Sequence, residues 1–132
     1  MAGGEFLTTA AEFNEFIRAT RPQIVQPDIT RCGGITEMRR IHHLTAATGV
    51  RCVPHGFSTG VLLAATVHFL ASIPDGDLIE HTQSIRPLAT DLVANKLPLI
   101  DGRVPVSDAP GLGVYLDEDL INAYRVDVTY GQ

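Results

Sequence analysis

Four ionisable side chains recur at nearly even spacing in the first 80 residues. They are Glu5, Asp28, His55 and Glu80, separated by 23, 27 and 25 residues. A histidine beside an aspartate can be held in one tautomer, which suits a general base. Glu5 is the type of ligand that a hard divalent cation such as Mg²⁺ prefers, and Glu80 can hydrogen-bond an oxygen on which charge develops. Together the four residue types predict removal of a proton next to a carboxylate.

The elements that would position these side chains alternate along the chain. Short buried strands are predicted at about residues 23–27, 51–54 and 78–80, and each spacing leaves room for one helix. A capping box, Thr9 to Glu12, predicts the start of the first helix, and Ser58 is the expected N-cap of a very apolar helix after it. Alternating strands and helices predict a parallel α/β sheet. The carboxyl ends of parallel strands lie at one face, so we expect the four side chains to meet there.

The residues after Glu80 follow a different pattern. The stretch LPLIDGRVPV predicts a hairpin with Asp101 and Gly102 at its tip. A turn is expected at Pro110 to Gly113, and Asp117 is expected to cap a last helix that runs through Tyr124.

Charge and composition exclude several classes of protein. The net charge is −5 and no basic stripe is present, which argues against nucleic acid as a partner. No apolar run reaches the ~20 residues of a membrane helix, and MAGGEFLTT lacks the features of a signal peptide, so a cytoplasmic location is expected. Cys32 and Cys52 lack metal-ligand spacing and are expected to be buried, reduced thiols. The other histidines on helices form no i,i+4 metal pair, which makes a zinc hydrolase a weak interpretation.

Several segments together resemble one known family. The stretches QPDITRCGGITE, VPHGF, AATVHFLASIPDGDLIE and DGRVPVSDAPGLGVYLD, with Glu5 in GEF, are similar to the C-terminal half of mandelate racemase-type members of the enolase superfamily. The resemblance extends over roughly residues 3 to 126. It implies that Glu5 is the last of three carboxylate ligands of Mg²⁺, and that Asp28 and His55 form a dyad with His55 as the acid/base. Glu80 would hydrogen-bond the substrate carboxylate and stabilise the enolic intermediate.

The resemblance also implies a fold. The expected class is α/β, a partial TIM (β/α) barrel formed by the last four βα units, followed by the C-terminal tail that returns to the capping domain. Residues 1–96 would be the C-terminal half of the barrel, and residues 97–132 would pack on the barrel and the capping domain. A whole TIM barrel needs about 250 residues. We therefore interpret the chain as a fragment of a longer enzyme or a truncated gene product, inactive alone.

The implied activity is that of a Mg²⁺-dependent acid-sugar dehydratase, a lyase. A 2-hydroxyacid racemase, an isomerase, is the alternative within the superfamily, and a non-catalytic half-barrel is the alternative from another class. The Asp28–His55 dyad argues against dipeptide epimerases and muconate-lactonizing enzymes, which use lysine instead. The expected partners are a small carboxylate substrate and either further copies of the chain or the other half of the barrel. The sequence leaves the individual acid sugar or hydroxy acid open.

Overall fold

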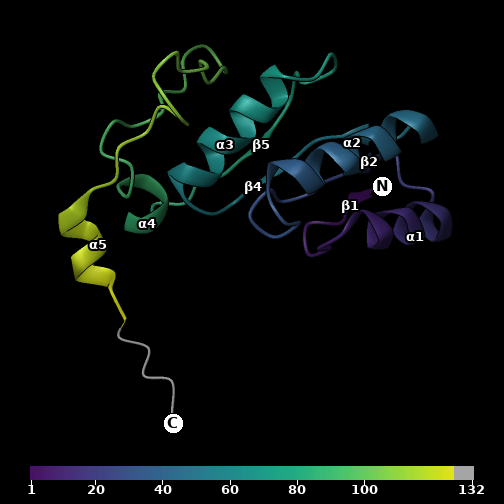
Figure 1. Cartoon of the computed structure of the whole chain (residues 1–132), viewed down its shortest axis with the longest axis horizontal. Helices are drawn as coiled ribbons and strands as arrows, with labels where there is room; N and C mark the ends of the chain where they lie inside the picture. The colour runs from purple at the N-terminus through teal and green to yellow at the C-terminus, as the bar shows by residue number, and fades with distance from the viewer. Residues whose placement is uncertain (127–132) are drawn as a thin grey trace, which may run out of the picture.

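A computed structural model of the chain describes residues 1–126. Short strands alternate with helices through the first 81 residues, and two further helices follow (Figure 1). The elements in chain order are β1 (Ala2–Gly3), α1 (Ala10–Thr20), β2 (Ile24–Val25), α2 (Ile35–Thr48), β3 (Arg51–Cys52), β4 (His55–Gly56), α3 (Gly60–Ala71), β5 (Glu80–His81), α4 (Pro87–Thr90) and α5 (Glu118–Tyr124).

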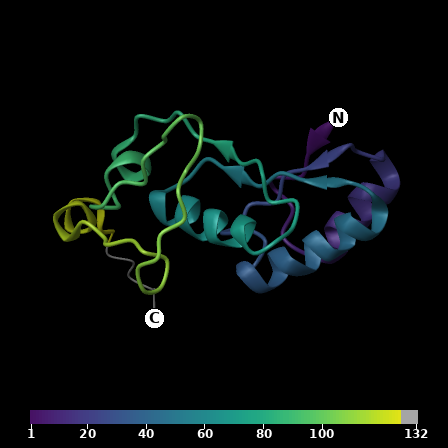
Figure 2. The ribbon, with the colours of Figure 1, turned by 90° about the horizontal axis from the view of Figure 1, so that it is seen from above.

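Within residues 1–126, every pair of neighbouring strands is parallel, as the sequence predicts. Strands β1, β2 and β3 form one sheet in that order, and β4 pairs with β5. Backbone hydrogen bonds continue between the two sheets, because the N–H of His55 donates to the carbonyl of Pro27 at 3.1 Å and the N–H of Glu80 donates to that of Pro54 at 3.0 Å. Neighbouring strands therefore follow one another in chain order. In Figure 2 helices α1, α2 and α3 lie on one side of the strands.

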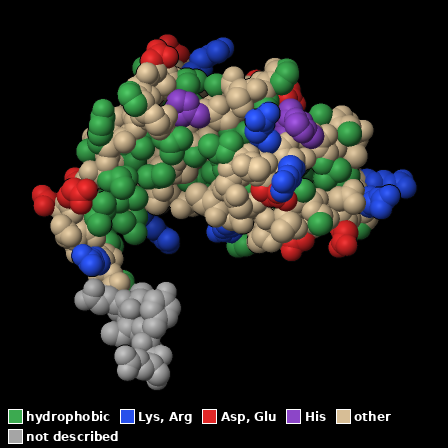
Figure 3. Space-filling view, in the orientation of Figure 1, with side chains coloured by type: hydrophobic (Ala, Val, Ile, Leu, Met, Phe, Trp, Pro, Cys, Tyr) green, Lys and Arg blue, Asp and Glu red, His purple; other side chains and the backbone are tan. Residues whose placement is uncertain are grey.

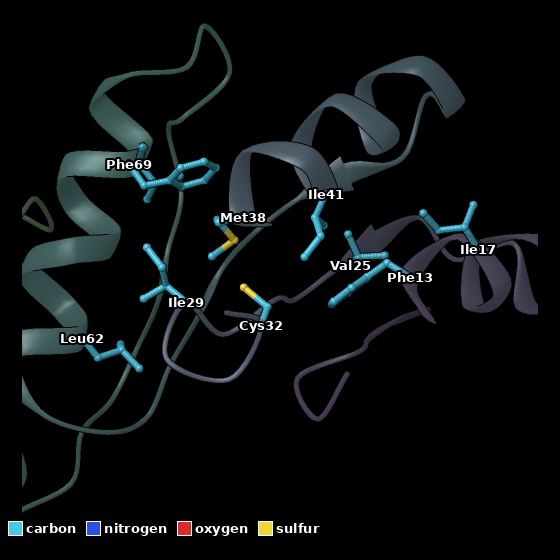
Figure 4. Close-up of a cluster of buried hydrophobic side chains, with 10 residues drawn as sticks. Phe13, Ile17, Val25, Ile29, Cys32, Met38, Ile41, Leu62 and Phe69 are labelled. Atoms are coloured by element: carbon cyan, nitrogen blue, oxygen red, sulfur yellow. The ribbon is translucent and has the colours of Figure 1, made fainter. Parts of the chain in front are cut away.

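The core lies between the strands and these helices. The first helix begins with the predicted capping box, in which Thr9 accepts from the N–H of Glu12 and the Glu12 side chain reaches back to the Thr9 N–H. Its apolar face contributes Phe13 and Ile17. Figure 4 shows the buried cluster, which extends from these two side chains through Val25 of β2 and Met38 and Ile41 of α2 to Leu62 and Phe69 of α3. The burial of this cluster fixes which face of each strand points toward the helices.

Some predicted boundaries were wrong. The strands are shorter than predicted, since each regular pair covers two residues and the chain runs on through Pro27 and Pro54, which have no N–H to donate to a ladder. Glu80 begins β5 and does not end a strand at 78–80. The N-cap of α3 is Thr59, whose hydroxyl accepts from the N–H of Leu62, and not Ser58. Thr59 has the extended backbone of a cap and directly precedes the first helical residue.

The segment after β5 carries most of the exposed apolar side chains. The predicted hairpin turn is confirmed: Ile100 and Arg103 exchange both backbone hydrogen bonds, and Asp101 and Gly102 have positive φ angles. The turn at residues 110–113 and the Asp117 cap of α5 are confirmed as well. Figure 3 shows hydrophobic side chains gathered over the half of the molecule formed by α3 and this segment. The exposed large hydrophobic residues after residue 77 are Leu78, Ile85, Leu88, Leu99, Ile100, Val106, Tyr115, Leu116, Tyr124 and Val126.

Contacts join the two sides of the predicted boundary at residue 96. The Asn95 side chain donates to the carbonyl of Gly113 and accepts from the N–H of Tyr115, both at 2.7 Å. Val93 and Leu116 form an antiparallel bridge. The division into residues 1–96 and 97–132 stays a prediction, and residues 127–132 lie outside the described part.

Candidate functional site

His55 and Glu80 are opposite each other in neighbouring parallel strands. Their Cα atoms are partners in the register of β4 and β5. The close approach of these strands depends on Gly56, since a side chain at that position would collide with the backbone carbonyl of Glu80. The local sequence His-Gly therefore places the histidine beside the glutamate.

Asp28 lies against the imidazole of His55. The Oδ2 atom of Asp28 is 2.9 Å from Nδ1 of His55, and Oδ1 accepts from the N–H of Thr30 at 2.8 Å and from its hydroxyl at 2.6 Å. Burial, which leaves 1% of Asp28 exposed, raises its pKa, but the hydrogen bonds from Thr30 and His55 outweigh burial and the net pKa is lowered. Asp28 is therefore ionised near neutral pH. A carboxylate at Nδ1 requires the proton on that nitrogen, which leaves the lone pair of Nε2 free to accept a proton.

Glu80 has a partner that the sequence analysis missed. The Nε2 atom of Gln26 donates to Oε2 of Glu80 at 3.0 Å. The neighbouring residues Val25 and Ile79 pack on the core, and successive strand side chains point to opposite faces, so Gln26 and Glu80 point away from the helices. The sequence held a signal for this contact, because Gln26 is a polar residue inside the predicted strand at 23–27. A strand buried against apolar layers on both faces would have an apolar residue at that position.

A second residue missed from the sequence is Phe57. Its ring lies 4.9 Å from the His55 ring, centroid to centroid, in an edge-to-face arrangement, and 50% of Phe57 is exposed. The contact closes one side of the imidazole. An aromatic residue two positions after the predicted base was the signal in the sequence.

Glu5 is joined to none of the other three predicted site residues by a hydrogen bond or ion pair. It follows β1, whose Gly3 pairs with Val25, and so it is at the same end of the sheet as Asp28. The guanidinium of Arg31 stacks over the ring of Phe6 at 4.6 Å and reaches the backbone carbonyl of Glu5. The Glu5 carboxylate makes no hydrogen bond or ion pair within residues 1–126.

Of the residues predicted from the sequence, only Glu5 was expected to bind Mg²⁺ directly. A partly exposed carboxylate without a protein partner suits a hard cation, and Glu5 meets that description. Among residues 1–126, however, no three His, Cys, Asp or Glu side chains are grouped so that they could hold a metal ion. Glu5 fits as one ligand of Mg²⁺, and the other ligands would have to come from outside these residues.

The remaining candidate groups lie outside this arrangement. Cys32 and Cys52 are free and buried, as predicted, and burial raises their pKa values to about 11 and about 12. His42 Nε2 is 2.7 Å from Oδ1 of Asp75, in the loop between α3 and β5, and this hydrogen bond lowers the pKa of Asp75. His68 contacts the backbone carbonyl of Leu112. Within residues 1–126 no helix has the length and apolar character to cross a membrane.

Fold and site together define an α/β domain that carries a His–Asp pair and a glutamate on adjacent parallel strands. Residues 1–120 match the family described as Enolase C-terminal domain-like, and the chain belongs to this family. It is 31% identical to D-galactarolactone cycloisomerase of Agrobacterium fabrum, covering 96% of this chain and 35% of that enzyme. It is 36% identical to L-talarate/galactarate dehydratase of Salmonella typhimurium, covering 100% of this chain and 31% of that enzyme.

Solved structures agree with this placement in the enolase superfamily. A mandelate racemase/muconate lactonizing protein from Paracoccus denitrificans, crystallised with magnesium, superposes with a TM-score of 0.78 at 32% identity. The match covers 98% of this chain and 35% of that one. The chain thus spans about a third of the length of the relatives that it matches. The predicted resemblance to the C-terminal half of mandelate racemase-type proteins is confirmed.

Proposed function

We propose that this chain is part of an enzyme that removes the proton alpha to a carboxylate, with acid sugars as its substrates. The observation that carries the proposal is the hydrogen bond between ionised Asp28 and His55, on a strand that sets His55 in register with Glu80. The base and a carboxyl group suited to a developing negative charge thus lie side by side.

The proposed architecture is that of a barrel segment. Residues 1–96 would be the last four βα units of a (β/α) barrel, and residues 97–132 would pack on the barrel and a capping domain. Parallel strands in chain order, with helices on one face, support this arrangement. The polar side chains on the opposite face would then line the barrel interior at its carboxyl end, where barrel enzymes have their active sites.

The described residues account for the proton transfer. Nε2 of His55 takes the α-proton, and the electrons of the C–H bond pass into the substrate carboxylate to give an enediolate. In its protonated form, the Glu80 carboxyl group donates a hydrogen bond to an oxygen of that group, while Asp28 stabilises the imidazolium. The β-hydroxyl group then leaves with its electrons, takes the proton from His55 and departs as water. Tautomerisation of the enol gives a 2-keto-3-deoxy acid.

Mg²⁺ is the proposed cofactor, with Glu5 as one of its ligands. When bound, Mg²⁺ supplies positive charge beside the substrate carboxylate and so makes the α-proton more acidic. The donor type of Glu5 and its lack of a protein partner within residues 1–126 support this assignment. The magnesium found with the Paracoccus denitrificans protein gives it further support.

Dehydration is the proposed outcome because the relatives similar to this chain include L-talarate/galactarate, L-rhamnonate and arabinonate dehydratases. A cycloisomerase is the second candidate, since two of the relatives carry that name. Both reactions can begin with the same proton abstraction. We propose a cytoplasmic enzyme that acts on a small carboxylate and associates with further copies of itself or with the rest of its barrel.

The test uses the complete enzyme that contains these 132 residues. Acid sugars are incubated with Mg²⁺ in D₂O, and exchange at the α-carbon and 2-keto-3-deoxy acid formation are followed by NMR. Both should be lost in His55→Asn with Mg²⁺ binding retained, and both should be slowed in Asp28→Asn. Wild-type rates in the His55 variant would contradict the assignment of the base. The 132-residue chain alone should show no turnover.

A further inference from the structure

One strand supplies the partners of both candidate reacting groups. Strand β2 leads into Gln26 and Asp28, two residues apart, and the side chain of each crosses to a neighbouring strand. Asp28 contacts His55 on β4, and Gln26 crosses beyond β4 to Glu80 on β5. His55 and Glu80 therefore both have their side-chain partner on the same segment, residues 26–28.

The hydrogen bond from Gln26 occupies one oxygen of Glu80 and leaves the other free. Oε2 accepts from the amide of Gln26, and within residues 1–126 Oε1 has no hydrogen-bond partner. A glutamate side chain with no partner would rotate about three bonds. The hydrogen bond from the amide restricts this rotation and leaves Oε1 available to another partner.

The geometry is poorly suited to a merely stabilising contact. Both side chains are partly exposed, so water competes for this hydrogen bond and limits its net contribution to stability. The pair also adds little connection between elements, because β2 and β5 are already linked through the backbone ladder of β3 and β4.

We propose that Gln26 is a positioning residue that orients the carboxyl group of Glu80 toward the substrate, an inference that rests on the proposed function. The amide has a further property that suits this task. It donates through Nε2 to a carboxylate and, after a flip, accepts through Oε1 from a protonated carboxyl group. Gln26 can thus hold Glu80 in place in either protonation state.

The contact itself can be tested on the 132-residue chain by NMR, without enzyme activity. With ¹⁵N in glutamine side chains, the amide protons of Gln26 should exchange more slowly than those of Gln23 and should change chemical shift in Glu80→Gln. Gln23 is the matched control, since its Oε1 accepts from the terminal amine of Met1. A Gln26 signal that is the same in both proteins would overturn the proposal.

The positioning role is tested by kinetics in the complete enzyme. Gln26→Met keeps the length of the side chain and removes the donor, and it should lower kcat roughly 10-fold to 100-fold with little change in KM. In the Glu80→Gln background the same substitution should cost almost nothing, because the residue acts through Glu80. Gln23→Met should have wild-type kinetics. An equal loss from Gln26→Met in both backgrounds would overturn the positioning role.

The NMR and kinetic experiments together distinguish a failure of this inference from a failure of the proposed function. If the wild-type enzyme exchanged no α-proton of any acid sugar, the proposed function would fail, and the NMR comparison would still decide whether Gln26 holds Glu80. If the wild-type enzyme were active and Gln26→Met matched it in kcat, the positioning role alone would fail.

Discussion

At the scale of single residues, Asp28 is the buried charge around which the hydrogen bonds of the site are arranged. This carboxylate is almost fully buried and accepts three hydrogen bonds, two from Thr30 and one from His55. A buried charge is tolerated only when it is satisfied in this way. Because one of these hydrogen bonds comes from His55, the stability of the buried carboxylate depends on where the imidazole lies.

The lowered pKa of Asp28 predicts how stability changes with pH. A carboxyl group whose pKa is lower in the folded chain stabilises it above the unfolded pKa, and this contribution is lost as the pH falls through the folded value. Urea unfolding of the 132-residue chain should therefore show a falling free energy of unfolding from about pH 5 downward. In Asp28→Asn the decline should be shallower. The control is Asp119→Asn, at an exposed position on α5, which should keep the wild-type slope; equal slopes in all three proteins would contradict the prediction.

Residue types and spacing were enough to predict that Asp28, His55 and Glu80 lie together, because each interval is about one βα unit long and parallel strands bring such residues to the same end of a sheet. They were not enough to find Gln26 or Phe57. A glutamine or a phenylalanine at such positions is usual in many proteins, and its role depends on which side chain faces it across the strands. That information is absent from spacing along the chain.

At the scale of elements, the approach of β4 to β5 depends on a single glycine. Gly56 follows His55, and a methyl group there would meet the carbonyl of Glu80. The strands would have to separate, which would disturb both the ladder and the register of His55 with Glu80. The site thus depends on the absence of a side chain at residue 56.

Gly56→Ala should therefore lower both stability and activity. We expect a loss of about 1–3 kcal/mol in the free energy of unfolding, as for other overpacked positions, measured by urea denaturation. Gly3→Ala is the matched control, because a methyl group there makes only ordinary contact with Phe16 at 3.7 Å and φ is not positive. Equal stability of the two variants would show that β4 and β5 can part without cost.

Helices were easier to predict than strands. The capping box at Thr9 and the Asp117 cap are local signals, since donor and acceptor lie within three residues. Strand length depends on partners that are distant in sequence, and the prolines at 27 and 54 interrupt the regular ladder where the apolar pattern continues. For α3 the choice between Ser58 and Thr59 depended on a backbone angle that residue type does not specify.

At the scale of the whole molecule, apolar surface and open strand edges occur together. Within residues 1–126, β1 has a neighbour only on the side of β2, and β5 has one only on the side of β4. Side chains such as Ile85 and Val126 are at least 80% exposed. The chain spans about a third of its relatives' length. In the barrel proposed above, the neighbouring strands and the capping domain would cover these edges and surfaces.

The 132-residue chain should consequently self-associate. Unpaired strand edges and exposed apolar surface both favour contacts between copies. Sedimentation velocity should show a mean mass that rises with concentration. Ala2→Pro is a specific probe of this edge. The backbone polar groups of Gly3 face β2, so those of Ala2 point outward, away from the sheet. The variant therefore removes one donor from the edge without breaking the β1–β2 ladder. It should associate more weakly than the wild-type chain. A stable, folded wild-type monomer at micromolar concentration would show that these surfaces are tolerated in water.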